Sequence, residues 1–240
     1  VLDIGCGTGL WSFMAAEQVG LHGKVIGIDP NPDSIAIANE RRNSHYLKSV
    51  IKFKKSDIKE AVKSLCDFDV VLMFNVLSYF DKPEDLLAQC LSFLKPGSRL
   101  ILKDSDLQSD QFWPDNDYLH EQILKETSTK THVKIGGGYD PFFAQKIPGI
   151  LKKFSTIRVS TISQSIILAH PFTHQERNYI RSNALTLADI AWKNGARKNG
   201  ARKNGNKWAS LFSAKSPDCI FENSEFAYST TEFAFQIIVG

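Results

Sequence analysis

Short apolar runs alternate with longer stretches of mixed polarity through the first hundred residues of the chain. The runs have no polar face, as in parallel strands that helices cover on both sides. The mixed stretches have apolar residues at helical spacing: Ile35 and Ala38 form a buried stripe, while Arg41 and Arg42 are expected to face water. The pattern predicts strands at 1–4, 24–28 and 67–75, the end of another at 53–58 and a fifth within 94–102, with helices near 9–19, 31–47, 58–65 and 83–94.

This repeated order of strand and helix predicts the fold class. Consecutive strands joined by helices form a parallel sheet with right-handed crossovers. We therefore expect an α/β, doubly wound, Rossmann-like sheet with helices on both faces. Further along the chain, the pattern predicts a helix over 140–151, a strand over 154–169, a helix over 173–192 and a last strand over 225–240.

Two segments depart from this order. Residues 104–139 show no clean periodicity and follow the fifth strand, where substrates enter open α/β sheets, so a cap-like insertion is expected there. A second insertion is expected at about 170–224. The prediction is therefore a single domain over 1–240, truncated at its N-terminus because the sequence starts inside a strand without Met.

Composition bears on the size of the core, on membrane spans and on the role of the cysteines. A chain of 240 residues with 42% hydrophobic content can bury one substantial core. No run approaches the ~20 apolar residues of a membrane span, so none is expected. The four cysteines are scattered without metal-ligand spacing, which favours small core residues over disulfides or zinc and predicts a cytoplasmic protein without a metal.

The formal net charge of +3 comes from one segment. Residues 193–207 repeat Lys-Asn-Gly-Ala-Arg and hold six basic residues and no acid, so the rest of the chain is mildly acidic. Glycine recurs too often for a helix, so the repeat predicts a flexible surface loop. A tether to RNA or lipid is the alternative, but a repeat expansion in a loop costs little entropy, and no nucleic-acid partner is expected.

Glycine occupies every second position where the first strand ends. Gly5, Gly7 and Gly9 allow a tight turn and remove the Cβ atoms that would keep a ligand from the backbone. The next helix points its first N–H groups at this turn. A dinucleotide-binding loop needs a small residue where this chain has Leu10, so the spacing disfavours a nicotinamide or flavin site.

The string Asp-Ile-Gly-Cys-Gly-Thr-Gly at 3–9 resembles motif I of class I S-adenosylmethionine-dependent methyltransferases. Acids after the second and third strands, an apolar fourth strand and a Lys-Pro-Gly turn follow in that family's order. The resemblance implies a seven-stranded sheet with an antiparallel last strand, S-adenosyl-L-methionine as cofactor and a small-molecule methyl acceptor. The cofactor-binding residues that it implies are Asp3, Gly5, Cys6, Gly7, Thr8, Gly9, Asp29, Pro30, Asp57, Ile58, Phe74 and Asn75.

Two of these acids have alternative interpretations. The resemblance implies that Asp29 accepts hydrogen bonds from ribose hydroxyls, that Asp57 accepts one from the adenine amino group, and that Ile58 packs on the ring. Either acid can instead cap the helix that follows it. The order of several signals along one chain favours cofactor binding.

No dedicated base is required, because orientation of donor and acceptor alone can lower a barrier by about 7–11 kcal/mol. The candidates for one are Asp104 and Asp106, after the fifth strand, and His120 and His132, in the expected cap. Tyr79 and Phe80 follow the fourth strand and are expected either to pack on a ligand or to close the core.

Residues 136–151 add a less specific resemblance, to methyltransferases related to the quinone-biosynthesis C-methyltransferases. Three functions remain open on the sequence. The first is methyl transfer to an O, N or C atom of a small molecule. The second is a binding domain that keeps the methyltransferase fold without catalysis. The third, which Leu10 opposes, is an NAD(P)-dependent oxidoreductase.

Overall fold

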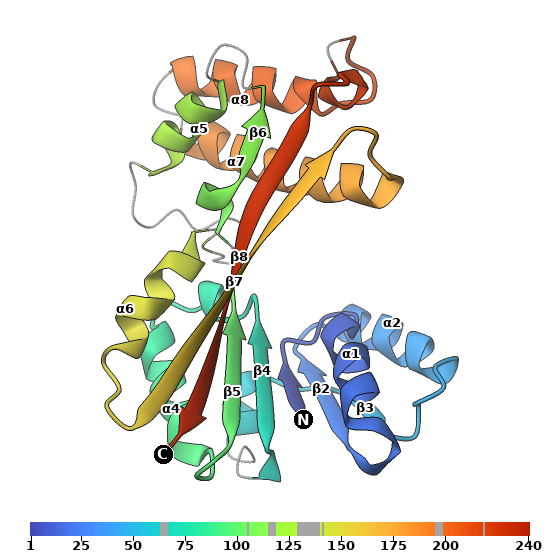
Figure 1. Ribbon diagram of the computed structural model, residues 1–240, viewed down its shortest axis with the longest axis vertical. Helices are drawn as coiled ribbons and strands as arrows, with labels where there is room; N and C mark the ends of the chain where they lie inside the picture. Colours follow the sequence, from blue (N-terminus) through green and yellow to red (C-terminus); the bar gives the residue numbers. More distant parts are fainter. Residues whose placement is uncertain are drawn as a thin grey trace. The chain divides into compact units, whose positions relative to one another are not determined.

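Parallel strands in the order β3-β2-β1-β4-β5 form the sheet of the first half of the chain in the computed structural model (Figure 1). Their bounds are Leu2–Ile4 (β1), Val25–Asp29 (β2), Ile51–Lys55 (β3), Val70–Phe74 (β4) and Arg99–Lys103 (β5). Strand β8 (Ala227–Val239) continues the sheet antiparallel to β5, with Phe235 opposite Leu102. The predicted doubly wound fold and its antiparallel last strand are confirmed.

The structure describes residues 1–240 except 63–66, 105, 115–118, 129–139, 141, 195–198 and 218, and only the backbone of 125–128, 191–194 and 199–203. The chain divides into two compact units. Unit 1 comprises Val1–Ser105, Phe143–Ile162 and Phe233–Gly240, and unit 2 comprises Asp106–Phe142 and Ser163–Glu232. Most of both expected insertions belongs to unit 2.

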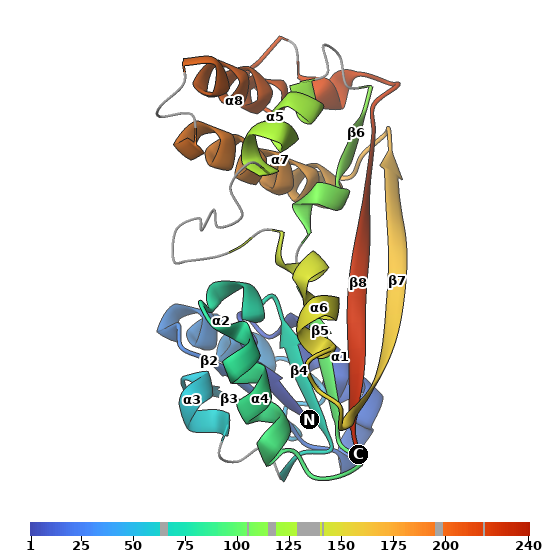
Figure 2. The same ribbon diagram turned by 90° about the vertical axis from the view of Figure 1, so that its left-hand side faces the viewer.

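Helices cover the sheet of unit 1 on both faces. Helices α1 (Leu10–Val19) and α2 (Pro32–Asn43) pack against β2 and β3 around Phe13 and Phe53. Helices α3 (Ile58–Ala61), α4 (Pro83–Phe93) and α6 (Ile147–Leu151) form a second cluster with β4, β5 and β8 (Figure 2). Alternate side chains of a strand point to opposite faces, so β2 contributes Val25 to the first cluster and Ile28 to the second.

Helix α2 shows how local sequence sets an element's bounds. The Asn31 side chain accepts hydrogen bonds from the N–H groups of Asp33 and Ser34, and Pro32 follows at the first helical position. The helix ends at Asn43, so the prediction that it continues to residue 47 is wrong. Leu47 is buried and lies in the turns that lead into β3.

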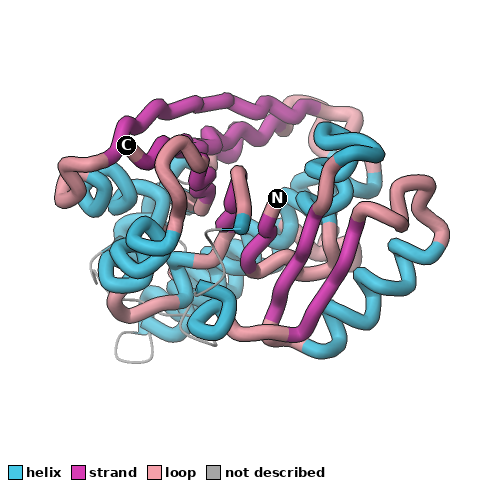
Figure 3. Tube along the Cα trace, turned by 90° about the horizontal axis from the view of Figure 1, so that it is seen from below, coloured by secondary structure: helices cyan, strands magenta, loops and turns pink. Residues whose placement is uncertain are grey.

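Unit 2 has an aromatic core. Phe112 of β6 (Gln111–Trp113) contacts Trp208, Phe212 and Tyr228 edge to face, with ring centroids 4.8–5.5 Å apart. Helices α5 (Leu119–Ser128), α7 (His174–Asn194) and α8 (Asn199–Leu211) belong to this unit. Strand β7 (Ile157–Ala169) pairs with β8, the strand that ends next to the C-terminus marked in Figure 3. The expectation of no regular element in 104–139 is therefore wrong over β6 and α5.

The basic repeat is not a loop throughout. Helix α7 runs to Asn194 and α8 starts at Asn199, so the flexible-loop prediction is wrong for 193–194 and 199–207. Tertiary packing explains why this part of the repeat is helical. Gly205 is buried and Trp208 is 1% exposed. The Trp208 indole N–H donates to the Ala184 carbonyl at 2.8 Å. Burial of this kind outweighs the roughly 1 kcal/mol that each helical glycine costs.

Three of the four cysteines lie in the described part of the chain. Cys6 and Cys90 are buried and Cys219 is half-buried, all three as free thiols, whereas Cys66 lies outside that part. No helix within the described ranges combines the length and the apolar content that crossing a membrane requires.

A buried carboxyl group in unit 2 makes stability depend on pH. Asp110 is 1% exposed, and burial raises its pKa to about 7, although Thr230, Tyr228 and Asn183 oppose the shift through hydrogen bonds. The folded state therefore favours the protonated carboxyl. This stabilisation is complete below the unfolded pKa of about 4 and is lost as the pH rises through about 7.

We expect Asp110→Asn to raise the free energy of unfolding by about 1–2 kcal/mol at pH 8, because the amide can hydrogen-bond without a buried charge. Denaturant titrations between pH 4 and pH 8 measure this. The substitution should also flatten the fall in stability between about pH 4 and pH 7. Glu225→Gln removes an exposed charge from the same unit and serves as the control. Equal pH profiles for Asp110→Asn and the wild type would contradict the assignment.

Candidate functional site

A cavity of about 600 Å³ lies at the carboxyl ends of β1, β2 and β4, within unit 1. Strand order reverses between β1 and β4, and such switch points are where open α/β sheets bind ligands. The cavity is lined by Ile4, Gly5, Gly7, Trp11, Ile28, Asp29, Pro30, Asn31, Ser34, Ser56, Asp57, Ile58, Phe74, Asn75, Val76, Tyr79 and Phe80. Eight of the twelve predicted cofactor-binding residues are in this set.

The glycine-rich loop forms one wall of the cavity. The N–H groups of Gly5 and Cys6 donate to the Ile28 carbonyl at 2.8 and 3.0 Å, which fixes the start of the loop on β2. Gly7 has φ +52°, and a Cβ atom at this position would meet no atom within 4 Å. The loop therefore has an open face toward the cavity at Gly7, as close backbone approach of a ligand requires.

Gly9 is glycine for a different reason. A Cβ atom at Gly9 would lie 2.6 Å from the Phe53 ring and 3.0 Å from the Phe13 ring. This glycine lets α1 and β3 pack closely and does not line the cavity. Cys6, which is buried, and Thr8 do not line it either, so the structure gives no direct support to a cofactor contact by these three residues.

Asp29 links the loop to β2. Its Oδ2 accepts a hydrogen bond from the Gly7 N–H at 2.9 Å, and its Oδ1 accepts one from the Asn31 N–H at 2.8 Å. Because Asn31 caps α2, the alternative interpretation of Asp29 as that helix's cap is wrong. The carboxylate lines the cavity and also holds the loop in place.

The alternative interpretation of Asp57 as a helix cap is confirmed, and its role in cofactor binding stays a prediction. Its Oδ1 accepts a hydrogen bond from the Lys59 N–H at 2.8 Å, so it caps α3, and the residue also lines the cavity. Ile58 lines the same end with an apolar side chain. A hydrogen-bond acceptor beside an apolar side chain suits a heteroaromatic ring with an exocyclic amino group.

Asp3 lies outside the cavity lining. It is 1% exposed, and the Ser12 hydroxyl donates to its Oδ2 at 2.6 Å, which connects β1 to α1. Burial raises the pKa of Asp3 to about 6, against the hydrogen bond from Ser12 that lowers it. The structure therefore shows Asp3 as a buried link between β1 and α1, and direct contact with a cofactor stays a prediction.

The end of β4 forms the opposite wall. Asn75 has φ +55° and donates its N–H to the Lys103 carbonyl at 2.7 Å. The Trp11 and Phe74 rings meet edge to face at 4.8 Å, and both line the cavity. Tyr79 is 50% exposed there; partial burial and then the charges of Asp104 and Asp29 raise its pKa, so it stays a neutral phenol.

The four candidates for a catalytic base do not lie together in the described structure. Asp104 is 4% exposed and accepts a hydrogen bond from the Ser78 N–H at 3.3 Å, beneath the turn that carries Tyr79. Asp106 caps a short turn in unit 2, and His120 is stacked on Trp208 in that unit's core. His132 lies outside the described residues. A role as base stays a prediction for each of the four.

Several lining residues were missed by the sequence reasoning. Asn31, Ser34 and Ser56 add polar groups near Asp29 and Asp57, while Trp11 and Val76 add apolar surface near Phe74. The pattern of hydrophobic and polar positions does not mark them as site residues, because each lies in a turn or at the first turn of a helix. The cavity lining thus combines carboxylates and polar groups with aromatic side chains.

Comparison with known proteins extends this picture. A family model described as a methyltransferase domain matches residues 1–166. A ubiquinone biosynthesis O-methyltransferase of Coxiella burnetii is 30% identical over 102 residues, covering 42% of this chain and 41% of that protein. A chloroplastic 2-phytyl-1,4-beta-naphthoquinone methyltransferase of Arabidopsis thaliana is 31% identical over 107 residues, covering 43% of this chain and 41% of that protein.

Solved structures show the same fold at low sequence identity. The YcgJ protein of Bacillus subtilis has a TM-score of 0.54 at 13% identity, covering 99% of this chain and 90% of that one. The plantazolicin methyltransferase BpumL in complex with SAH has a TM-score of 0.50 at 19% identity, covering 100% of this chain and 75% of that one.

The match to the family model covers well over half of the chain and includes the glycine-rich loop, β2, β3 and β4, which form the cavity. It therefore agrees with the family that motif I and the order of the two acids predicted. On the matched sequence and the shared doubly wound fold, this chain belongs to the methyltransferase domain family.

Proposed function

We propose that this chain is an S-adenosylmethionine-dependent methyltransferase that acts on a small molecule. The observation that carries the proposal is the open face of Gly7 in a cavity that also contains the carboxylates of Asp29 and Asp57. The aligned curated relatives are matched over only 41% of their length, so activity and substrate are inferred for this chain from its own site.

The cavity residues fit the chemical groups of S-adenosyl-L-methionine. Asp29 provides an acceptor for ribose hydroxyls, and Asp57 with Ile58 provides an acceptor and an apolar contact for adenine. The loop around Gly5 and Gly7 offers backbone for close approach of the methionine portion. The ligand carries a sulfonium and an ammonium group, and it suits a cavity where the described lining residues include two carboxylates and no Lys or Arg.

The bound cofactor would supply an electrophilic methyl group. A nucleophilic O, N or C atom of the acceptor would bond to this carbon as the carbon–sulfonium bond breaks, which leaves S-adenosylhomocysteine and releases the acceptor's proton to solvent. The residues of this chain then have three tasks: binding the donor, orienting it and excluding water. The aromatic side chains of Trp11, Phe74 and Tyr79 line the same cavity, where they can restrict the donor's position. Orientation of this kind is the largest expected contribution to rate.

A small-molecule acceptor agrees with the chemistry of the site and with the two curated relatives named above, a ubiquinone biosynthesis O-methyltransferase and a 2-phytyl-1,4-beta-naphthoquinone methyltransferase. We propose that the protein acts in the cytoplasm and has no nucleic-acid partner. Neither the spacing at Leu10 nor the family match favours an NAD(P)-dependent oxidoreductase.

Incubation of the protein and a cell extract with methyl-labelled S-adenosyl-L-methionine tests the proposal. Mass spectrometry should find a labelled small molecule that is absent when the protein is omitted. Binding of the donor without any labelled product would instead support a domain that keeps the fold and has lost catalysis. If the donor does not bind at all, the proposed function is wrong.

A further inference from the structure

The glycine-rich loop needs fixed anchor points because several of its residues have positive φ angles. Gly5, Gly7 and Gly9 have φ values of +71°, +52° and +90°. Hydrogen bonds to the Ile28 carbonyl and to Asp29 hold its first half on β2. Its second half, at Thr8, has a different anchor, which comes from α2.

That anchor is Arg41. Its Nη1 donates to the Thr8 carbonyl at 3.1 Å and lies 3.3 Å from the Thr8 hydroxyl oxygen, although the two residues are 33 positions apart. The guanidinium also lies over the Phe13 ring, 5.6 Å from its centroid. Arg41 thus connects the last turn of α2 to the loop and to the first turns of α1.

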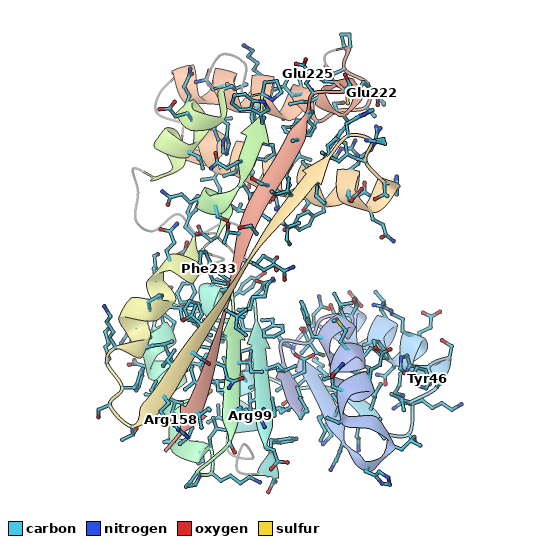
Figure 4. All side chains as sticks on the ribbon, in the orientation of Figure 1. Tyr46, Arg99, Arg158, Glu222, Glu225 and Phe233 are labelled. Atoms are coloured by element: carbon cyan, nitrogen blue, oxygen red, sulfur yellow. The ribbon has the colours of Figure 1, made fainter. Side chains whose placement is uncertain are left out.

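Aromatic rings support this position of Arg41. The Phe13 ring packs against Phe53 at 5.5 Å and against His45 at 4.9 Å, and His45 stacks on Tyr46 at 4.8 Å. Tyr46 is 74% exposed and ends this row of rings at the surface of unit 1 (Figure 4). A planar guanidinium held over a ring loses less freedom when it forms hydrogen bonds than a flexible ammonium does.

We propose that Arg41 is a positioning residue for the donor site: it holds Thr8 so that Gly7 keeps its open face toward the cavity. The inference rests on the proposed function, because its effect is measured on cofactor binding. Arg41 does not line the cavity, so it acts through the loop. Nothing in the periodicity of α2 distinguishes it from its neighbour Arg42, which was expected to face water in the same way.

The direction of the change in ligand affinity distinguishes a positioning role of Arg41 from a purely electrostatic effect of its charge. S-adenosyl-L-methionine has a net charge of about +1 at neutral pH, whereas S-adenosylhomocysteine is neutral overall, as follows from their ionisable groups. Removal of a nearby positive charge would therefore tighten binding of the cation and leave the neutral ligand unchanged. Loss of loop positioning would weaken binding of both ligands to a similar extent.

The experiment measures dissociation constants for both ligands by calorimetry in the wild type and in Arg41→Ala, Arg41→Lys and Arg42→Ala. We expect Arg41→Ala to weaken binding of both ligands about 3- to 10-fold, as for the loss of solvent-exposed charged hydrogen bonds. Arg41→Lys should recover part of the affinity, because lysine can still donate to the Thr8 carbonyl. Arg42→Ala removes an equal charge from the same turn and should change affinity less than 2-fold, on the same scale.

Kinetics with a methyl acceptor found in the labelling experiment give a second measurement. Arg41→Ala should raise KM for the donor and leave kcat and the acceptor's KM unchanged. Thermal unfolding without ligand checks that the variants remain folded. If Arg41→Ala binds both ligands as the wild type does, or binds only the cation more tightly, the positioning role is wrong. Failure of the wild type to bind either ligand would overturn the proposed function instead.

Discussion

Gly7→Val is expected to weaken binding of S-adenosyl-L-methionine at least about 100-fold, which corresponds to about 3 kcal/mol. Gly7 lines the cavity, and the space where its Cβ would stand is open. A branched side chain there would occupy the volume that the methionine portion needs. Calorimetric titration measures the loss, and circular dichroism on the same sample checks the fold.

The control for this variant is Gly97→Val. Gly97 also has positive φ, at +83°, and a Cβ atom there would meet nothing within 4 Å, but it lies in an exposed turn before β5 and does not line the cavity. Both substitutions force valine into the left-handed region, at a cost of about 1–2 kcal/mol in stability. Only Gly7→Val should lose binding. Near-normal affinity in a folded Gly7→Val protein would show that the loop is only a turn.

Asp29→Ala is expected to weaken cofactor binding by about 1.5–3 kcal/mol, or roughly 10- to 150-fold. The substitution removes a charged acceptor for the ribose and also the acceptor that holds the Gly7 N–H. Equilibrium binding of S-adenosylhomocysteine measures the change. Asp29→Asn should have an intermediate effect, because the two backbone N–H groups donate to different oxygens of the carboxylate, and asparagine keeps only one of these two acceptors.

Asp33→Ala provides the comparison for Asp29→Ala. Asp33 is exposed in the first turn of α2 and does not line the cavity, so its removal changes the net charge equally. Its expected effect is confined to a small loss of helix stability, about 0.3–1 kcal/mol. If both aspartate variants bind with unchanged affinity, Asp29 has no part in the site.

The sequence predicted the parallel sheet and the Gly7 and Asp29 wall of the cavity because these features depend on local signals. Buried strands read as apolar runs, and glycine spacing and strand-end acids mark the carboxyl edge of the sheet. The same local signals do not show tertiary contacts. Gly9 is in the motif, but its contact with Phe53, 44 positions away along the sequence, gives it a packing role.

The basic repeat and Arg41 also show that local sequence signals do not reveal tertiary contacts. The glycines of the basic repeat indicated a loop, but burial of Trp208 and Gly205 outweighs their low helix propensity in α8. Helical periodicity placed Arg41 and Arg42 alike in solvent. In the structure Arg41 is exposed and hydrogen-bonded to Thr8, whereas Arg42 is half-buried and donates to Asn43 Oδ1. Such contacts arise from the packing of α2 beside the loop and cannot be read from either segment alone.

A crystal structure with S-adenosylhomocysteine tests the central claim most directly. We predict one ligand in the cavity of unit 1, with its amino-acid portion against Gly7, its ribose hydroxyls within hydrogen-bonding distance of Asp29, and its adenine beside Asp57 and Ile58. The contradicting result is a ligand bound elsewhere, or in this cavity without contact to Gly7 and Asp29.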